Sequence, residues 1–154
     1  MGQAQTVPDS LKTKYHEFDF WLGEWDVYNY NTNDLAGTSA IQSVIDSIGI
    51  LEHYSTAKGP YKGKSLNKYN PAKDHWEQFW VDNSGLTLHL TGGLIKGKMV
   101  LSDLLTNPEK ETINKIVWQR LSEEKVRQTW SISKDQGITW QVIFDGEYRP
   151  KNPK

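Results

Sequence analysis

The chain has 154 residues, a length that suits one domain with a sizeable hydrophobic core, and no composition shift or Pro/Ser-rich linker divides it. Its 18 basic and 19 acidic residues are interspersed and give a net charge of −1, which argues against nucleic acid as the main partner. There is no cysteine, so a disulfide framework, a thiol nucleophile and a cysteine-based zinc site are excluded.

The chain starts with MGQAQTVPDS, which is polar and rich in small residues. We predict a disordered segment over residues 1–8 and a single domain over residues 9–150. Such a start is typical of a secreted or periplasmic domain in its mature form, without its signal peptide, and a cytoplasmic location is the open alternative. No apolar run approaches the roughly 18 residues that a membrane-spanning helix needs, so we expect no membrane span.

Residues 9–18 predict a short helix or helical turn with Asp9 or Ser10 as its N-cap. Beyond it, aromatic residues, which make up 12% of the chain, occur among Val, Ile and Thr between closely spaced turn signals. This pattern is typical of β-structure. About ten strands are expected, at residues 23–31, 38–47, 50–57, 65–70, 75–82, 86–92, 98–103, 111–121, 125–133 and 138–149.

Nearly all of these strands are joined by short turns, so they predict an all-β, antiparallel up-and-down meander of about 8–10 strands. A meander of this length tends to close into a β-barrel, because closure leaves no edge strand exposed. A β-sandwich is the alternative.

The stretch SKDQGITW, residues 133–140, fits the Ser-x-Asp-x-Gly-x-Thr-Trp pattern of the Asp-box hairpins of sialidase propellers. A propeller would repeat the box roughly every 40–50 residues, and this chain has one copy. The octapeptide therefore predicts a hairpin between the last two strands and no sialidase.

The stretch FDFWLGEWDV, residues 18–27, resembles the opening of the DUF1579-like family, bacterial domains of unknown function grouped with the lipocalin-like calycin barrels. Further matches follow in order at ILEHY, GKSLNKYNP, WEQFWVDNSGLTLHLTG, VRQTW and FDGEY, so that the resemblance covers about residues 18–148. It implies a small calycin-like barrel with an N-terminal helical segment plugging one end, and no known activity. Trp25 takes the place of the Gly-x-Trp indole that calycins pack under the barrel floor, so we expect Trp21 and Trp25 to be structural.

A barrel of this size can hold one small ligand, because alternate side chains of each strand face the lumen. Lysine side chains favour water, so Lys68 is expected to point outward, and the residues of opposite parity on 65–70 then point inward. By the same reasoning, Glu77 is placed outside on residues 75–82. The resulting inward residues are Ser65, Asn67, Tyr69, Gln78 and Trp80, a wall of aromatic and amide groups suited to a ligand with a few polar atoms.

Two further strands contribute candidate lumen residues. The resemblance favours the face of Glu52 and Tyr54 as inward. Gln128 shares a face with Trp130, whereas Arg127 has the opposite parity. Arg127 pairs either with Glu52 through a bulge or with an acidic residue at the surface.

The four histidines, at positions 16, 53, 75 and 89, have no metal-ligand spacing, so no metal site is predicted. His89 lies opposite a leucine face and is expected either in the lumen or exposed. Haem-binding relatives among the calycins use a histidine on a late strand, and no histidine follows His89 here. We therefore expect neither haem nor any other cofactor.

These observations favour a binding protein that holds a small hydrophobic or amphipathic molecule in the barrel lumen. The alternative is a small cofactor-free isomerase, cyclase or hydrolase that uses Glu52 or His89 for proton transfer, and a third hypothesis is a filled barrel that serves as an interaction module. A homodimer through an outer face also stays open. The predicted ligand-binding residues are Glu52, Tyr54, Asn67, Tyr69, Gln78, Trp80, His89, Gln128 and Trp130.

Overall fold

The structure is a computed structural model, and it describes residues 6–152. Helix α1 (Asp9–Tyr15) and the 3₁₀ helix η1 (Asp19–Trp21) precede ten strands. The strands are β1 (Gly23–Asn29), β2 (Leu35–Val44), β3 (Gly49–Thr56), β4 (Lys62–Asn70), β5 (His75–Asp82), β6 (Thr87–Ile95), β7 (Lys98–Ser102), β8 (Ile113–Ser122), β9 (Lys125–Ser133) and β10 (Gln141–Pro150).

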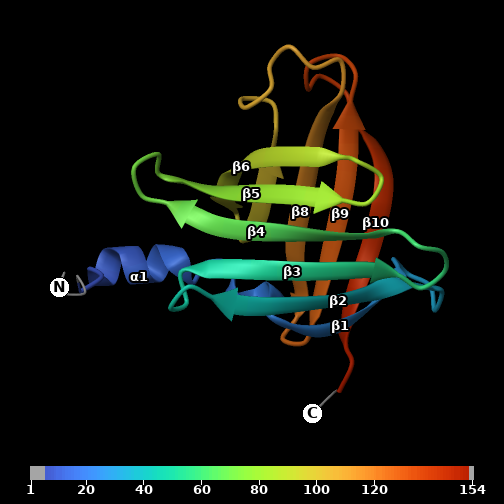
Figure 1. Ribbon diagram of the computed structural model, residues 1–154, viewed down its shortest axis with the longest axis horizontal. Helices are drawn as coiled ribbons and strands as arrows, with labels where there is room; N and C mark the ends of the chain where they lie inside the picture. Colours follow the sequence, from blue (N-terminus) through green and yellow to red (C-terminus); the bar gives the residue numbers. More distant parts are fainter. Residues whose placement is uncertain (1–5, 153–154) are drawn as a thin grey trace.

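The ten strands form one closed barrel in which each strand pairs antiparallel with its neighbours in sequence and β1 pairs with β10 (Figure 1). The predicted all-β meander barrel is thus confirmed, and the sandwich alternative is wrong. Closure gives every strand two partners, so no edge is left for pairing with another chain. The prediction of disorder over residues 1–8 falls mainly on residues 1–5, which lie outside the described residues.

Most strands lie where the alternation of side chains placed them, and the exceptions have local causes. β2 begins at Leu35, before the predicted start, because Leu35 and Gly37 pair with Tyr28 and Val27 of β1. β10 begins only at Gln141, because the preceding residues belong to a hairpin. None of the helices among residues 6–152 has the length and apolar character needed to cross a bilayer.

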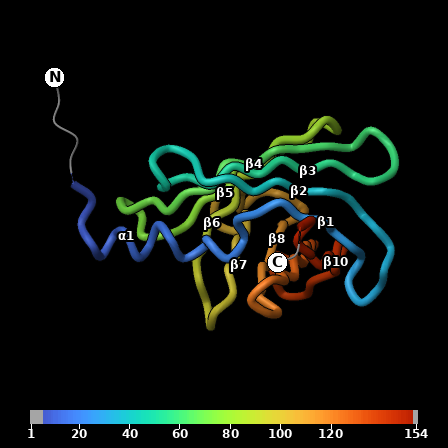
Figure 2. The backbone as a smooth tube through the Cα atoms, turned by 90° about the horizontal axis from the view of Figure 1, so that it is seen from below, coloured from blue at the N-terminus to red at the C-terminus, as the bar shows by residue number. Residues whose placement is uncertain are grey.

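Helix α1 starts without a side-chain cap, so the prediction of Asp9 or Ser10 as N-cap is wrong. Pro8 precedes the first turn instead, and its carbonyl oxygen accepts hydrogen bonds from the backbone N–H groups of Leu11 and Lys12, both at 3.0 Å. The helix lies at one end of the barrel (Figure 2). Its Tyr15 packs edge-on against Tyr69 of β4, with ring centroids 6.1 Å apart.

An aromatic plug closes this end of the barrel. Phe18 is fully buried and stacks on Trp21 with ring centroids 4.8 Å apart, and it meets Trp118 and Trp76 edge-on at 5.0 and 5.7 Å. The indole N–H of Trp25 donates a hydrogen bond to the carbonyl oxygen of Trp21 at 2.8 Å. Both indoles are buried, in agreement with the structural role expected for them.

The Asp-box octapeptide forms the hairpin between β9 and β10. Asp135 accepts a hydrogen bond from the backbone N–H of Thr139 at 2.8 Å, and Ser133 Oγ accepts one from the N–H of Gly137 at 2.8 Å. Gly137 has a φ of +87°, a backbone conformation that residues other than glycine rarely adopt. The box is therefore a turn device here, as its single copy indicated.

Candidate functional site

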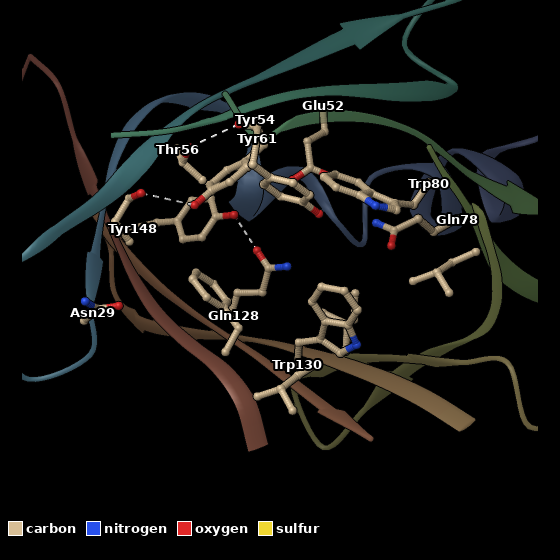
Figure 3. A pocket seen from close by; sticks show the side chains of 15 residues that line it. Asn29, Glu52, Tyr54, Thr56, Tyr61, Gln78, Trp80, Gln128, Trp130 and Tyr148 are labelled. Carbon is tan, nitrogen blue, oxygen red and sulfur yellow. Dashed lines mark hydrogen bonds between the residues drawn. The ribbon is translucent and has the colours of Figure 1, made fainter. Parts of the chain in front are cut away.

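A cavity of about 400 Å³ occupies the half of the barrel away from the plug (Figure 3). β1 starts beside η1 at the plugged end, so Asn29, the last residue of β1, lies at the opposite end. Asn29 and Ile143 line the cavity and are exposed, so the cavity reaches solvent at that end. Six of its fifteen lining residues are aromatic: Tyr54, Tyr61, Trp80, Trp130, Phe144 and Tyr148.

A ladder of polar side chains runs along the inner face of β3, β4 and β5. Strand register places Glu52 opposite Ser65 and Asn67 opposite Gln78. Ser65 Oγ donates to Glu52 Oε1 at 2.6 Å, Asn67 Nδ2 donates to Ser65 Oγ at 2.8 Å, and Gln78 Nε2 donates to Asn67 Oδ1 at 2.8 Å. All four side chains are almost completely buried, so the ladder fixes their orientations.

Glu52 is the acidic member of this ladder and borders the cavity. Burial raises the pKa of its carboxyl to about 7, although the hydrogen bond from Ser65 acts in the opposite direction. Among the described residues, no lysine, arginine or histidine lines the cavity. Glu52 is therefore a carboxyl group that changes charge near neutral pH in a mainly apolar chamber.

Three tyrosine hydroxyls lie near this carboxyl. Tyr148 donates a hydrogen bond to Gln128 Oε1, and its pKa lies well above the ordinary value because of burial and of the negative charge of Glu52. Burial also raises the pKa values of Tyr54 and Tyr61. All three phenols therefore stay protonated at neutral pH and serve as hydrogen-bond donors.

At the open end, Asp82 holds two aromatic side chains in place. Its Oδ2 accepts hydrogen bonds from the Tyr61 hydroxyl at 2.8 Å and from the Trp80 indole N–H at 2.9 Å. Burial acts to raise the pKa of Asp82, but the hydrogen bonds from Ser84, Trp80 and Tyr61 together lower it to about 2. Asp82 is thus an ionised anchor for the cavity wall, and its acceptor sites are used by these groups.

Six of the nine predicted site residues line the cavity. They are Glu52, Tyr54, Gln78, Trp80, Gln128 and Trp130. Figure 3 shows Gln128 and Trp130 across the cavity from Glu52. Whether these side chains contact a ligand stays a prediction.

The other three predicted residues lie elsewhere. Asn67 and Tyr69 face inward as expected, but Asn67 is fully buried behind the cavity wall in the polar ladder. Tyr69 belongs to the plugged end, where it contacts Trp76 and hydrogen-bonds to Asp74. The inner faces of β4 and β5 continue past the cavity into the solid core, which alternation alone does not reveal.

His89 lies on the outer face of β6, so the outward one of the two placements left open for it is found, and its inclusion among the lumenal binding residues is wrong. Leu88 and Leu90 take the inward positions and are fully buried. The His89 ring stacks on Phe79 with centroids 4.4 Å apart, and its Nε2 lies 3.7 Å from Glu77 Oε1. Of the two proton-transfer candidates, only Glu52 therefore borders the cavity.

Arg127 likewise points outward, where Nε and Nη2 donate to the Asp145 carboxylate at 2.9 and 2.7 Å. The surface pairing is thus the one formed, and Glu52 has no arginine partner. Throughout residues 6–152, no group of three or more histidine or carboxylate side chains is arranged to hold a metal ion.

Sequence reasoning missed Tyr61, Phe144 and Tyr148 as cavity residues. Tyr61 lies between the strands predicted at residues 50–57 and 65–70, outside both. On β10, Phe144, Gly146 and Tyr148 alternate with the charged Asp145, Glu147 and Arg149. This alternation indicates that Phe144 and Tyr148 face inward. A register shift between Val142 and Phe144 obscures it at the start of the strand.

Comparisons with known proteins leave the structure as the guide to function: no family model matches the chain, and no curated protein matches it. The fold defines a closed antiparallel β-barrel with a cavity inside it. This architecture is compatible with binding of a small molecule in the lumen.

Proposed function

We propose that the protein binds a small hydrophobic or amphipathic molecule in the barrel lumen. The observation that carries this proposal is the cavity of about 400 Å³ with aromatic walls and a few fixed polar groups. Ligand sites commonly have volumes of roughly 300–1,000 Å³ and this kind of lining. A ligand body would cover apolar surface that the protein leaves uncovered inside a concave site, which is favourable.

The third hypothesis, a filled barrel, fits only the plugged half. There, Phe18, Trp21, Trp76 and Trp118 are at most 1% exposed and fill the space between the strands. In the other half, Tyr54 and Trp130 keep part of their surface uncovered although they point inward. The two halves therefore support a division between a structural core and a binding chamber.

We also infer that the chain belongs to the DUF1579-like family of calycin-like domains. The order of the motifs over residues 18–148 supports this inference, and so does the barrel with an aromatic plug that follows a short helix. Ten strands in a single meander are consistent with a barrel of that kind.

Native mass spectrometry of the protein purified from its own organism tests the binding proposal, with the same sample under denaturing conditions as reference. We expect one small molecule per chain that is lost on denaturation. In parallel, the neutral dye prodan is expected to bind the recombinant protein with a blue shift of its fluorescence.

Two tryptophan variants locate the dye. Trp80→Ala removes a cavity wall and should weaken prodan binding several-fold, whereas Trp140→Ala, in the β9–β10 hairpin outside the cavity, should not. Absence of both a co-purifying molecule and a dye shift would refute the proposal. Equal loss in both variants would place the dye outside the lumen.

A second candidate function is a cofactor-free enzyme in which Glu52 transfers a proton. It is favoured by the pKa of about 7 of this carboxyl, which suits a general acid or base at neutral pH. The test is to incubate the co-purified molecule with wild-type protein and with Glu52→Gln. An enzyme converts the molecule only in the wild type, whereas a binding protein returns it unchanged in both cases.

A further inference from the structure

The polar ladder leaves one buried hydrogen-bond acceptor without a partner. Ile50 contributes a carbonyl oxygen that accepts from Asn67 Nδ2 at 3.2 Å, so the Asn67 amide is oriented with Oδ1 toward Gln78. Gln78 must then present its Nε2 to Asn67, which leaves its Oε1 on the other side. Gln78 is 1% exposed, lines the cavity, and its Oε1 has no partner among the described residues.

Glu52 adds a second acceptor beside it. Ser65 Oγ accepts from both Asn67 and Gln78, so its one hydrogen goes to Glu52 Oε1. Glu52 and Gln78 therefore meet at the same hydroxyl group. None of the ion pairs among residues 6–152 involves Glu52.

A buried acceptor that lacks a donor is destabilising, and a buried carboxylate without a cation is more so. The phenol hydroxyls near Glu52 already donate elsewhere, to the Ala36 carbonyl oxygen, to Asp82 and to Gln128. No basic side chain of the described residues lines the cavity, so these groups do not supply the missing donors. The walls beside the two acceptors include the aromatic rings of Tyr54 and Trp80 (Figure 3). Faces of aromatic rings attract cations.

We propose that the ligand carries a primary ammonium group, which donates hydrogen bonds to the Glu52 carboxylate and to Gln78 Oε1 while its apolar body lies against the aromatic walls. This inference rests on the proposed binding function and specifies the ligand class. A primary ammonium has three N–H donors and a positive charge, and so satisfies both acceptors at once. A carboxylate ligand would face Glu52 with like charge.

Binding of such a cation displaces the proton of Glu52. The other titratable groups that face this carboxyl are Tyr54, Tyr61 and Tyr148, whose raised pKa values keep them neutral between pH 5.5 and 8.5. Because the pKa of Glu52 is about 7, roughly half a proton should be released per ligand at pH 7, and almost none at pH 8.5. The affinity for an amine should rise as the pH increases from 5.5 to 8.5.

The test compares phenethylamine, phenethyl alcohol and hydrocinnamate, which share a phenyl body and differ in head-group charge. Each is titrated directly by calorimetry at pH 7.5. We expect phenethylamine to bind at least about tenfold more tightly than the alcohol, and hydrocinnamate to bind most weakly. Calorimetry at pH 7 in buffers of different ionisation enthalpy measures the released proton.

Three variants assign the effect. Glu52→Gln should abolish the preference for the amine and the proton release but leave the affinity for the alcohol within about twofold. Gln78→Met should reduce the preference without affecting proton release. Glu24→Gln, an exposed position on β1, is the matched control and should behave as wild type.

Equal affinity for amine and alcohol, or no detectable binding of phenethylamine, would overturn this inference. If prodan or a co-purified molecule still binds in the lumen, the proposed binding function stands without it. A preference for the amine that persists in Glu52→Gln would also overturn it, because the cation would then lie elsewhere.

Discussion

Ser65 and Glu52 lie opposite each other on β4 and β3, and the Ser65 hydroxyl donates to Glu52 Oε1 at 2.6 Å. This bond is the last in a series that begins at the Ile50 carbonyl oxygen and passes through Asn67. Backbone geometry thus sets the orientation of a side chain in the cavity. Among the described residues that line the cavity, Glu52 is the one carboxyl, and neutral groups hold it.

Ser65→Ala should raise the pKa of Glu52 above its present value of about 7, because the hydrogen bond from Ser65 favours the ionised form and burial remains. The pKa is measured by following the side-chain carboxyl carbon of Glu52 by NMR across the pH range. Ser43→Ala, at an exposed position on β2, serves as control. An unchanged or lower pKa in Ser65→Ala would contradict the assigned role of this bond.

Glu52 should make the protein less stable as pH rises from about 4.5 to about 7. Its pKa is raised from 4.5 in the unfolded chain to about 7 in the folded protein, so the folded state binds more protons in this interval. Stability is then greatest below the unfolded pKa and falls as pH rises through the folded one. The shift corresponds to at most about 3 kcal/mol.

Glu52→Gln removes this dependence because an amide does not titrate. Urea unfolding of wild type and variant at pH 5 and pH 8 gives the two free energies of unfolding. The variant should gain stability relative to the wild type between the two pH values, by up to about 3 kcal/mol. A constant difference would show that Glu52 titrates alike in both states.

The barrel was predictable because alternation and turn signals are local. β5 and β9 have the bounds expected from sequence. Lys68 sufficed to place Asn67 inside, and Glu77 sufficed to place Gln78 inside. The position of the cavity along the barrel was not predictable in this way. It depends on where the aromatic plug ends, and that end is fixed by packing between residues distant in sequence.

The errors on individual residues have the same origin. The sequence allowed His89 to face either the lumen or the exterior, because both the leucine face and the threonine face of its strand suit a barrel interior. Its packing against Phe79 on the outer face decides the orientation. Tyr61 was missed because its role comes from a hydrogen bond to Asp82, 21 residues away. Such long-range contacts leave no pattern in a single strand.

The aromatic plug should be a main source of stability. Phe18 is 0% exposed and contacts four aromatic rings, so Phe18→Ala should cost about 3–5 kcal/mol in the free energy of unfolding. Phe79 is 47% exposed on the outer face, and Phe79→Ala should cost under about 1 kcal/mol. Urea unfolding of the two variants tests this contrast, and similar losses would mean that the plug is loosely packed.

Gly63 on β4 leaves room for the Trp80 indole beside the cavity. A Cβ atom at this position would lie 2.3 Å from Trp80 Cζ2 and 2.5 Å from Cη2, distances that side chains do not tolerate. Gly63→Ala must therefore displace the indole and strain its 2.9 Å hydrogen bond to Asp82. We expect a loss of about 1–3 kcal/mol in stability and a several-fold weaker affinity for prodan.

Gly93→Ala is the matched control, since Gly93 also lies in a strand and a Cβ there meets no atom within 4 Å. This change should leave stability within about 0.5 kcal/mol or increase it slightly, because alanine restricts the unfolded chain. Urea unfolding and prodan titration of both variants separate the two effects. If Gly63→Ala lost stability but bound prodan normally, Trp80 would support the barrel without forming the wall that a ligand contacts.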